Sequence, residues 1–251
     1  MSEPLPVFAL HGWALNAAVF APLLDDCAGR WVVTPDLPGH GSKRNESLGR
    51  DPGVVARRLL EEAPARAIWL GWSLGGLLSL AATLAAPERV AALVLVASTP
   101  CFVARPDWPA GMPRVRLEAM AAELARDPAA TVDEFLTWQV HANTHGEAAL
   151  RGLRTALAKR GGASPEALAD GLALLEATDY RDRLAGIELP VLVIAGGRDR
   201  LVRPAAARAT VERLPAGRLA PIAEAGHAPF LSHPIAFRVA LADFLHALSD
   251  A

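Results

Sequence analysis

A serine between two glycines is the first residue whose surroundings suggest chemistry. Ser73 lies at the centre of a G-x-S-x-G match that spans residues 71–75. In such a match the serine projects from a sharp strand-to-helix turn, and the glycines let the strand and the helix approach closely. An apolar run precedes it and a Leu- and Ala-rich stretch follows it. Ser73 is therefore the candidate nucleophile, although an ordinary tight turn between a strand and a helix remains the alternative.

A serine hydroxyl needs a base to take its proton and an acid to orient that base. His227 is the candidate base among seven histidines, because it follows the last strand-like run in a loop where Gly226 frees the backbone. Asp199 is the candidate acid, because it follows a buried run and a glycine turn. An ordinary turn aspartate would also fit that position. All three candidates come after strand-like runs, in the order Ser73, Asp199, His227.

The remaining histidines have other expected roles. His233 stands just before a proline and is predicted to begin the last helix. His141, His145 and His246 lie in helical or surface contexts. His11 is expected to be structural rather than a second base.

Negative charge on an attacked carbonyl oxygen must be stabilised by hydrogen-bond donors. The backbone N–H of Leu74 lies at the start of the helix that follows the nucleophile, where it is aimed at this charge. The second donor is expected from the loop after the first strand, through the N–H of Trp13. The oxyanion hole is thus predicted to consist of Leu74 and Trp13. The turn at 36–41 is assigned no chemistry.

An alternation of strands and helices must position these residues. Short apolar runs bounded by Gly, Pro or Asp predict buried parallel strands. They span residues 6–10, 31–35, 67–71, 90–97, 190–195 and 218–223. Helices are predicted at 51–62, 74–86 and 204–214. The class is therefore α/β, with a mostly parallel sheet flanked by helices.

The alternation stops between residues 100 and 189, where Ala-, Leu- and Arg-rich helical segments replace the strands. We expect a helical cap inserted between core strands, above the carboxyl ends of the sheet, where such sheets bind ligands. The predicted division is a core of residues 1–99 and 190–251 and a cap of residues 100–189. Ordinary crossover helices are the alternative.

Composition excludes several classes of protein. With 52% hydrophobic and 21% charged residues the chain is not intrinsically disordered, and a net charge of -2 provides no basic field for nucleic acid. Cys27 and Cys101 form no CxxC pair and have no zinc-site spacing, so neither a metal, a cofactor nor a disulfide is expected. Without a signal peptide or a membrane-length apolar run, we expect a cytoplasmic monomer that binds no membrane.

The chain resembles α/β hydrolases over nearly its whole length, because its motifs occur in family order and the order Ser, Asp, His belongs to that arrangement. Within this superfamily it is similar to the BioH family. Members of that family are carboxylesterases that hydrolyse the methyl ester of pimeloyl-[acyl-carrier protein] in biotin biosynthesis. The narrower match rests on residues 11–16, 67–76, 97–102 with 108–109, and 227–230 with 232–234.

The resemblance implies a partner, an acyl-carrier protein that bears the pimeloyl methyl ester. It also implies a set of substrate-binding residues, namely Trp13, Ser73, Leu74, Phe135, Leu136, Thr137, Trp138, Gln139 and His227. The antiparallel hairpin that often opens this fold is expected to be short or missing.

Several alternatives stay open. Basic residues of the cap provide a local charge that would attract an acidic carrier protein, or they are simply solvated helix faces. They are Arg114, Arg116, Arg126, Arg151, Arg154, Lys159 and Arg160. The rival functions are a broad-specificity carboxylesterase, a carbon–carbon bond hydrolase, and a slow-turnover receptor for a small ligand.

Overall fold

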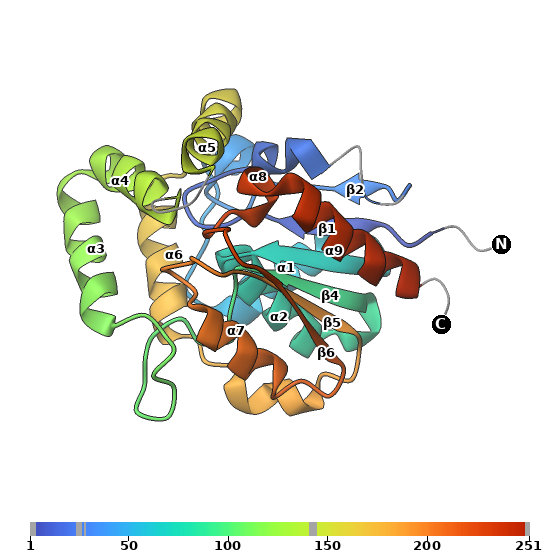
Figure 1. The fold of residues 1–251 in the computed structure, drawn as a ribbon. Helices are drawn as coiled ribbons and strands as arrows, with labels where there is room; N and C mark the ends of the chain where they lie inside the picture. Colours follow the sequence, from blue (N-terminus) through green and yellow to red (C-terminus); the bar gives the residue numbers. More distant parts are fainter. Residues whose placement is uncertain (1–3, 24–26, 28, 141–144, 249–251) are drawn as a thin grey trace.

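In the part of the chain that the computed structural model describes, residues 4–23, 27, 29–140 and 145–248, six strands form one sheet (Figure 1). They lie in the order β2-β1-β3-β4-β5-β6, and every neighbouring pair is parallel. The strands are β1 (Val7–Leu10), β2 (Val32–Val33), β3 (Ala67–Trp72), β4 (Val90–Val96), β5 (Val191–Gly196) and β6 (Gly217–Ile222). The predicted parallel sheet is confirmed.

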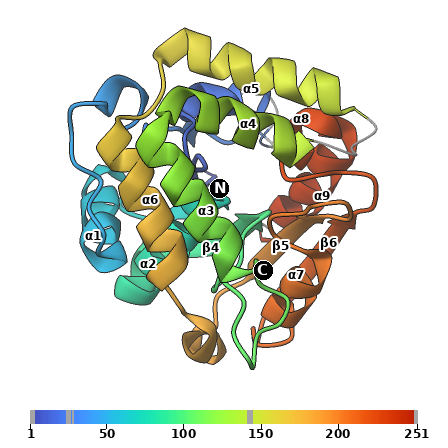
Figure 2. The ribbon, with the colours of Figure 1, turned by 90° about the vertical axis from the view of Figure 1, so that its left-hand side faces the viewer.

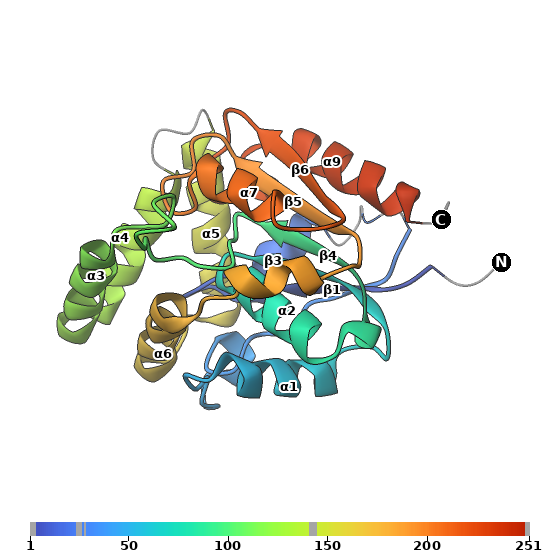
Figure 3. The same cartoon turned by 90° about the horizontal axis from the view of Figure 1, so that it is seen from below.

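Helices cover both faces of this sheet. Figure 3 shows α1 (Pro52–Glu62) and α2 (Leu74–Ala85) on one side and α9 (Pro234–Ala247) on the other. The short α8 (Pro229–Ser232) precedes α9, and α7 (Pro204–Val211) connects β5 to β6. Strands covered on both faces are apolar on both, and every residue of β3 and β5 is buried.

Two predicted elements are shorter in the structure. The strand expected at 31–35 is only the two-residue β2, which lies at the edge of the sheet with an exposed Trp31 before it. The helix expected at 204–214 ends at Val211, and Leu214 closes a tighter turn by donating its N–H to Val211 O. Pro215 explains this end, because a residue before proline is disfavoured in the α-helical region.

Among the described residues, four α-helices separate β4 from β5 along the chain. They are α3 (Arg114–Arg126), α4 (Pro128–Val140), α5 (Gly146–Arg160) and α6 (Pro165–Ala177). Figures 1 and 2 place them together on the side to which the carboxyl ends of the strands point. In parallel α/β sheets this is the edge at which ligands bind.

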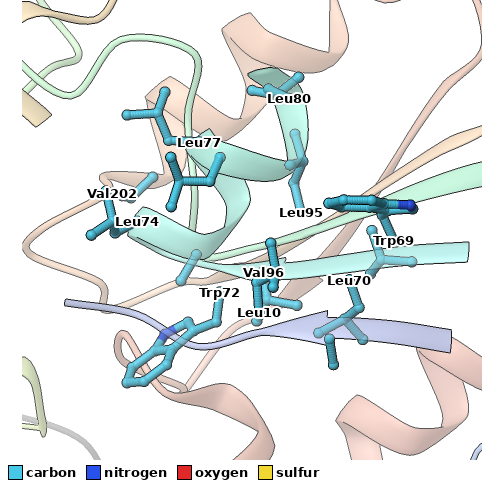
Figure 4. Close-up of a cluster of buried hydrophobic side chains, with 14 of the residues drawn as sticks. Leu10, Trp69, Leu70, Trp72, Leu74, Leu77, Leu80, Leu95, Val96 and Val202 are labelled. Carbon is cyan, nitrogen blue, oxygen red and sulfur yellow. The ribbon is translucent and has the colours of Figure 1, made fainter. Parts of the chain in front are cut away.

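Alternating side chains of β3 fill both faces of the sheet (Figure 4). Trp69 lies on the α2 side, whereas Leu70 and Trp72 point to the opposite face. All of these side chains are buried. The strand that leads to Ser73 is therefore held by packing on two sides.

Within the described ranges, no helix combines the length and apolarity that a membrane crossing requires.

Candidate active site

The backbone of Ser73 forms a strained turn between β3 and α2. Its φ of 54° and ψ of -118° lie in a region that residues with side chains rarely occupy. Hydrogen bonds hold it there: Ser73 N donates to Val96 O at 3.0 Å, and Ser98 Oγ donates to Ser73 O at 2.8 Å. The serine hydroxyl is thereby presented at the amino end of α2.

The glycines on either side of Ser73 are required by close approach. A Cβ at Gly71 would lie 2.4 Å from Gly75 O, and a Cβ at Gly75 would lie 2.2 Å from Leu10 O. Real Cβ atoms essentially never come this close to backbone atoms. The spacing in the G-x-S-x-G match therefore lets α2 fold back against β3 and against the end of β1.

His227 and Asp199 are joined by a buried hydrogen bond. His227 Nδ1 lies 2.8 Å from Asp199 Oδ2. The other carboxylate oxygen, Asp199 Oδ1, accepts the backbone N–H groups of Leu201 and Val202 at 2.8 and 3.0 Å. With Nδ1 donating to the carboxylate, the Nε2 atom of a neutral His227 carries the lone pair. This Nε2 is buried and has no hydrogen-bond partner among the described residues.

The loop that carries His227 is fixed from two directions. Trp72 Nε1 donates to His227 O at 2.7 Å, and the two rings lie 5.8 Å apart. Since Trp72 directly precedes Ser73, the histidine loop is attached to the strand that carries the serine. On the other side, His227 N donates to Gln139 O of α4 at 3.2 Å.

The two expected oxyanion donors lie beside the serine. A Cβ at Gly12, next to Trp13, would lie 3.2 Å from Ser73 Cβ, so the loop after β1 lies against the turn. No hydrogen bond within the described residues uses the backbone N–H of Trp13 or of Leu74. Both groups therefore remain available to a substrate oxygen, and the amino end of α2 adds favourable potential for negative charge.

His11 has the contacts of a structural histidine. Its Nε2 accepts the N–H of Leu37 at 2.9 Å, so its Nδ1 carries the hydrogen and donates to Gly12 O at 2.9 Å. Burial, assisted by the nearby His40, lowers the pKa of His11 to about 3. Burial likewise lowers the pKa of His40 to about 4. Both rings are neutral at pH 7, and neither reaches the serine through a described hydrogen bond.

Asp36, in the turn assigned no chemistry, also has a structural role. Burial opposes its ionisation, but hydrogen bonds from Ala17 N and from the N–H and hydroxyl of Ser42 outweigh burial and lower its pKa. The carboxylate ties the loop after β1 to the loop after β2.

The other histidines lie where the sequence indicated. His233 directly precedes α9, which confirms that it begins the last helix. His145 precedes α5 and His246 lies within α9. His141 lies outside the described residues.

A narrow apolar cavity adjoins Ser73. Of its lining side chains only the serine is polar, and Trp13 and Phe135 are the predicted substrate contacts that it includes. The other lining residues are Phe102, Met112, Leu117, Met120, Leu172, Leu175 and Leu201. The sequence interpretation did not assign these residues to the site. No spacing signal distinguishes them: Leu117, Met120, Leu172 and Leu175 lie in helices rich in Ala and Leu, and the other three lie in loops.

The remaining predicted substrate contacts on α4 point in different directions. Leu136 lines a separate hollow with Ala14 and Leu168, and Thr137 is exposed and donates to Asp133 O of its own helix. Trp138 lies next to the cavity, in hollows that also include Met112. Gln139 is buried, and neither atom of its side-chain amide has a partner among the described residues.

Most of the basic side chains between β4 and β5 have acidic partners on the protein itself. On the helices, Arg114 pairs with Glu176, Arg151 with Glu147, Arg154 with Asp133 and Arg160 with Asp36. Outside these α-helices, Arg105 and Arg181 pair with Asp179, and Arg181 also pairs with Asp107. The local basic excess indicated by the sequence is therefore largely neutralised on these helices.

No cluster of three or more His, Cys, Asp or Glu side chains that could hold a metal occurs in the part of the chain described here.

A family comparison accounts for this arrangement. Residues 7–240 match the model of the alpha/beta hydrolase family. The chain belongs to the alpha/beta hydrolase family. The six-stranded parallel sheet with its flanking helices is the fold of this family, as the motifs predicted.

Two relatives of this alpha/beta hydrolase are named pimeloyl-[acyl-carrier protein] methyl ester esterase. One, from Stenotrophomonas maltophilia (strain K279a), is 42% identical over 244 residues, which cover 96% of this chain and 93% of the relative. The other, from Xanthomonas campestris pv. campestris (strain B100), is 42% identical over 240 residues, which cover 95% of this chain and 94% of the relative.

Solved structures agree on the fold. An esterase from Exiguobacterium antarcticum superposes with a TM-score of 0.87 at 24% identity, covering 98% of this chain and 93% of that one. A thermophilic esterase from Thermogutta terrifontis superposes with a TM-score of 0.80 at 22% identity, covering 97% of this chain and 90% of that one. At these identities the likeness is one of fold.

Proposed function

We propose that this alpha/beta hydrolase is a serine carboxylesterase that hydrolyses the methyl ester of pimeloyl-[acyl-carrier protein], in biotin biosynthesis. The observation that carries the chemistry is the buried Asp199–His227 hydrogen bond, which leaves His227 Nε2 without a partner among the described residues, while Trp72, the residue before Ser73, donates a hydrogen bond to His227 O. The two relatives at 42% identity support the substrate, because that ester is in their names.

In the first half of the reaction, His227 Nε2 takes the proton of the Ser73 hydroxyl as the oxygen attacks the ester carbonyl. The N–H groups of Leu74 and Trp13 bind the oxyanion that forms. His227 then gives its proton to the methoxy oxygen, the bond from the carbonyl carbon to this oxygen breaks, and methanol leaves an acyl-enzyme on Ser73.

In the second half, His227 takes a proton from a water molecule, whose oxygen attacks the acyl-enzyme carbonyl. The same two N–H groups stabilise the second oxyanion. Collapse returns the proton to Ser73 and releases the free carboxylic acid. Asp199 stays ionised throughout, where it fixes the tautomer of His227 and stabilises the imidazolium.

The walls of the cavity beside Ser73 are apolar, as contact with the acyl chain of this substrate requires. Each methylene of a pimeloyl group that leaves water contributes about 0.8 kcal/mol, and nine of the ten residues around the cavity are apolar. We assign residues 100–189 to a cap that supplies part of this wall, over a core of residues 1–99 and 190–251. Phe135, Leu136, Thr137, Trp138 and Gln139 are the proposed cap contacts.

The test is hydrolysis of purified pimeloyl-[acyl-carrier protein] methyl ester, followed as methanol release and as the loss of one methylene from the mass of the acylated carrier. Ser73→Ala should abolish turnover and leave the melting temperature unchanged. Ser47→Ala, at an exposed serine far along the chain from the turn, is the matched control. Rescue of biotin-requiring growth in a strain that lacks this esterase tests the same function in cells.

Each proposed role has an outcome that contradicts it. Turnover retained by Ser73→Ala would exclude Ser73 as the nucleophile. Rapid hydrolysis of p-nitrophenyl butyrate without hydrolysis of the carrier-bound ester would identify a broad-specificity carboxylesterase instead. Tight ligand binding without hydrolysis of any ester would point to a receptor.

A further inference from the structure

Three arginines surround a hollow next to the catalytic aspartate. Arg116 comes from α3, whereas Arg200 and Arg203 come from the loop between β5 and α7. Trp138 and Asp199 line the same hollow, together with Met112 and Pro113. Two parts of the chain, α3 and the loop between β5 and α7, thus place three guanidinium groups around one hollow.

The positive charge of this hollow is not balanced by the protein. Among the described residues, no carboxylate forms an ion pair with Arg116, Arg200 or Arg203, unlike the four paired arginines of the neighbouring helices. The acidic residue in the described lining is Asp199. Its two oxygens already accept hydrogen bonds from Leu201, Val202 and His227.

Trp138 supports one of these guanidinium groups. The Arg116 guanidinium carbon lies 4.4 Å from the centre of the Trp138 ring, a cation–π contact that holds the side chain at the hollow. All three arginine residues are exposed, so their donors are accessible to a ligand from solvent. Planar guanidinium groups match the oxygens of a phosphate in two-point hydrogen bonds.

Some residues that line this hollow also line the spaces between it and the serine. Met112, Arg116 and Trp138 also line a second hollow, between α3 and α4. This second hollow shares Met112, Met120 and Phe135 with the cavity beside Ser73. The three spaces therefore adjoin one another along α3 and α4, between the serine and the three arginines.

We propose that Arg116, Arg200 and Arg203 bind the phosphodiester of the phosphopantetheine arm that carries the acyl group. This inference rests on the proposed function. The arm joins the phosphodiester at one end to the acyl chain at the other, and the methyl ester lies at the far end of that chain. With the ester at Ser73, the phosphodiester must lie outside the enclosed cavity. The unpaired arginines at the end of the adjoining spaces provide an anion site there.

The test compares two methyl pimeloyl thioesters that differ by one phosphate, one of phosphopantetheine and one of pantetheine. The measured quantity is the kcat/KM for the phosphopantetheine thioester divided by the kcat/KM for the pantetheine thioester. This ratio should fall about tenfold in Arg116→Gln, which removes one charge-assisted contact, and further in Arg200→Gln/Arg203→Gln, which removes two. Arg208→Gln, at an exposed arginine on α7, is the matched control and should keep the wild-type ratio. The wild-type ratio should also fall as salt is added.

The outcomes separate this inference from the proposed function. If the wild-type protein hydrolyses neither thioester nor the carrier-bound ester, the proposed function fails. If it hydrolyses them and the ratio is the same in all variants, only the phosphate site is wrong. If the variants lose activity on the carrier-bound ester while the ratio is unchanged, the arginines contact the carrier protein rather than its phosphate, which also overturns the inference.

Discussion

Asp199→Asn is the substitution that most directly probes the hydrogen bonding around His227. Asparagine has the same size as aspartate but offers one carbonyl oxygen and one NH₂ group. In the structure Asp199 Oδ1 accepts two backbone N–H groups, from Leu201 and Val202. The carbonyl oxygen of the introduced asparagine must take this position, because an NH₂ group there would face two donors.

The NH₂ group of the introduced side chain then faces His227 Nδ1, at the position where Oδ2 lies 2.8 Å from it in the wild-type protein. Nδ1 must become an acceptor, which moves the ring hydrogen to Nε2. A protonated Nε2 of a neutral ring cannot take the proton of Ser73. From the effect of this tautomer change in Ser-His-Asp hydrolases, we expect kcat to fall about 10⁴-fold, equivalent to about 5 kcal/mol of transition-state stabilisation.

The assay is the kcat for hydrolysis of p-nitrophenyl acetate, and thermal melting of each variant verifies the fold. Asp243→Asn, at an exposed aspartate in α9, controls for the loss of one negative charge and should keep wild-type kcat. A folded Asp199→Asn protein with a kcat within tenfold of wild type would refute the proposed role of the Asp199–His227 hydrogen bond.

The tight turn, the buried histidines and the apolar cavity each give one further prediction. Gly75→Ala should lower the free energy of unfolding in urea by about 3 kcal/mol or more, because its Cβ would lie 2.2 Å from Leu10 O; an unchanged value would mean that the loop after β1 yields freely. As the pH is lowered from 7 to 5, the free energy of unfolding should fall by about 2 kcal/mol for each of His11 and His40. Their pKa values of about 3 and 4 in the fold lie below the 6.5 of an unfolded histidine, so acid protonates the unfolded chain first; denaturation that is independent of pH in this window would contradict buried neutral rings. Across methyl esters from butyrate to heptanoate, kcat/KM should rise about fourfold per methylene, and a flat series would show that the acyl chain does not enter the apolar cavity.

Much of the candidate site is predictable from the sequence because it depends on local geometry. The G-x-S-x-G spacing predicted the turn at Ser73, and the structure shows that a side chain at Gly71 or Gly75 would collide with the backbone. Likewise, Asp199 and His227 each follow a strand-like run in the sequence, and the structure shows β5 and β6 ending before them. Such signals lie in a few consecutive residues, so they can be recognised without knowledge of the rest of the fold.

The cavity wall was less predictable because it depends on how helices rotate. Phe135 and Leu136 are neighbours in α4, yet Phe135 lines the cavity beside Ser73 and Leu136 lines a different hollow. The rotation of α4 is set by packing against α3, α5 and Trp13. Its sequence is apolar on more than one side and contains no mark of that orientation.

The sequence by itself determined the order of the proposed nucleophile, acid and base along the chain, the strands that precede them, and the family to which the motifs belong. Tertiary structure decided which atoms meet. The sheet order brings the carboxyl ends of β3, β5 and β6 to one edge, where His227 Nδ1 reaches Asp199 Oδ2 and Trp72 ties the histidine loop to the serine turn. The tertiary structure also brings Arg116, Arg200 and Arg203 to the lining of one hollow. The physical reason is that turn sterics act between adjacent residues, whereas contacts between distant side chains form only once the packed core sets their distance and direction.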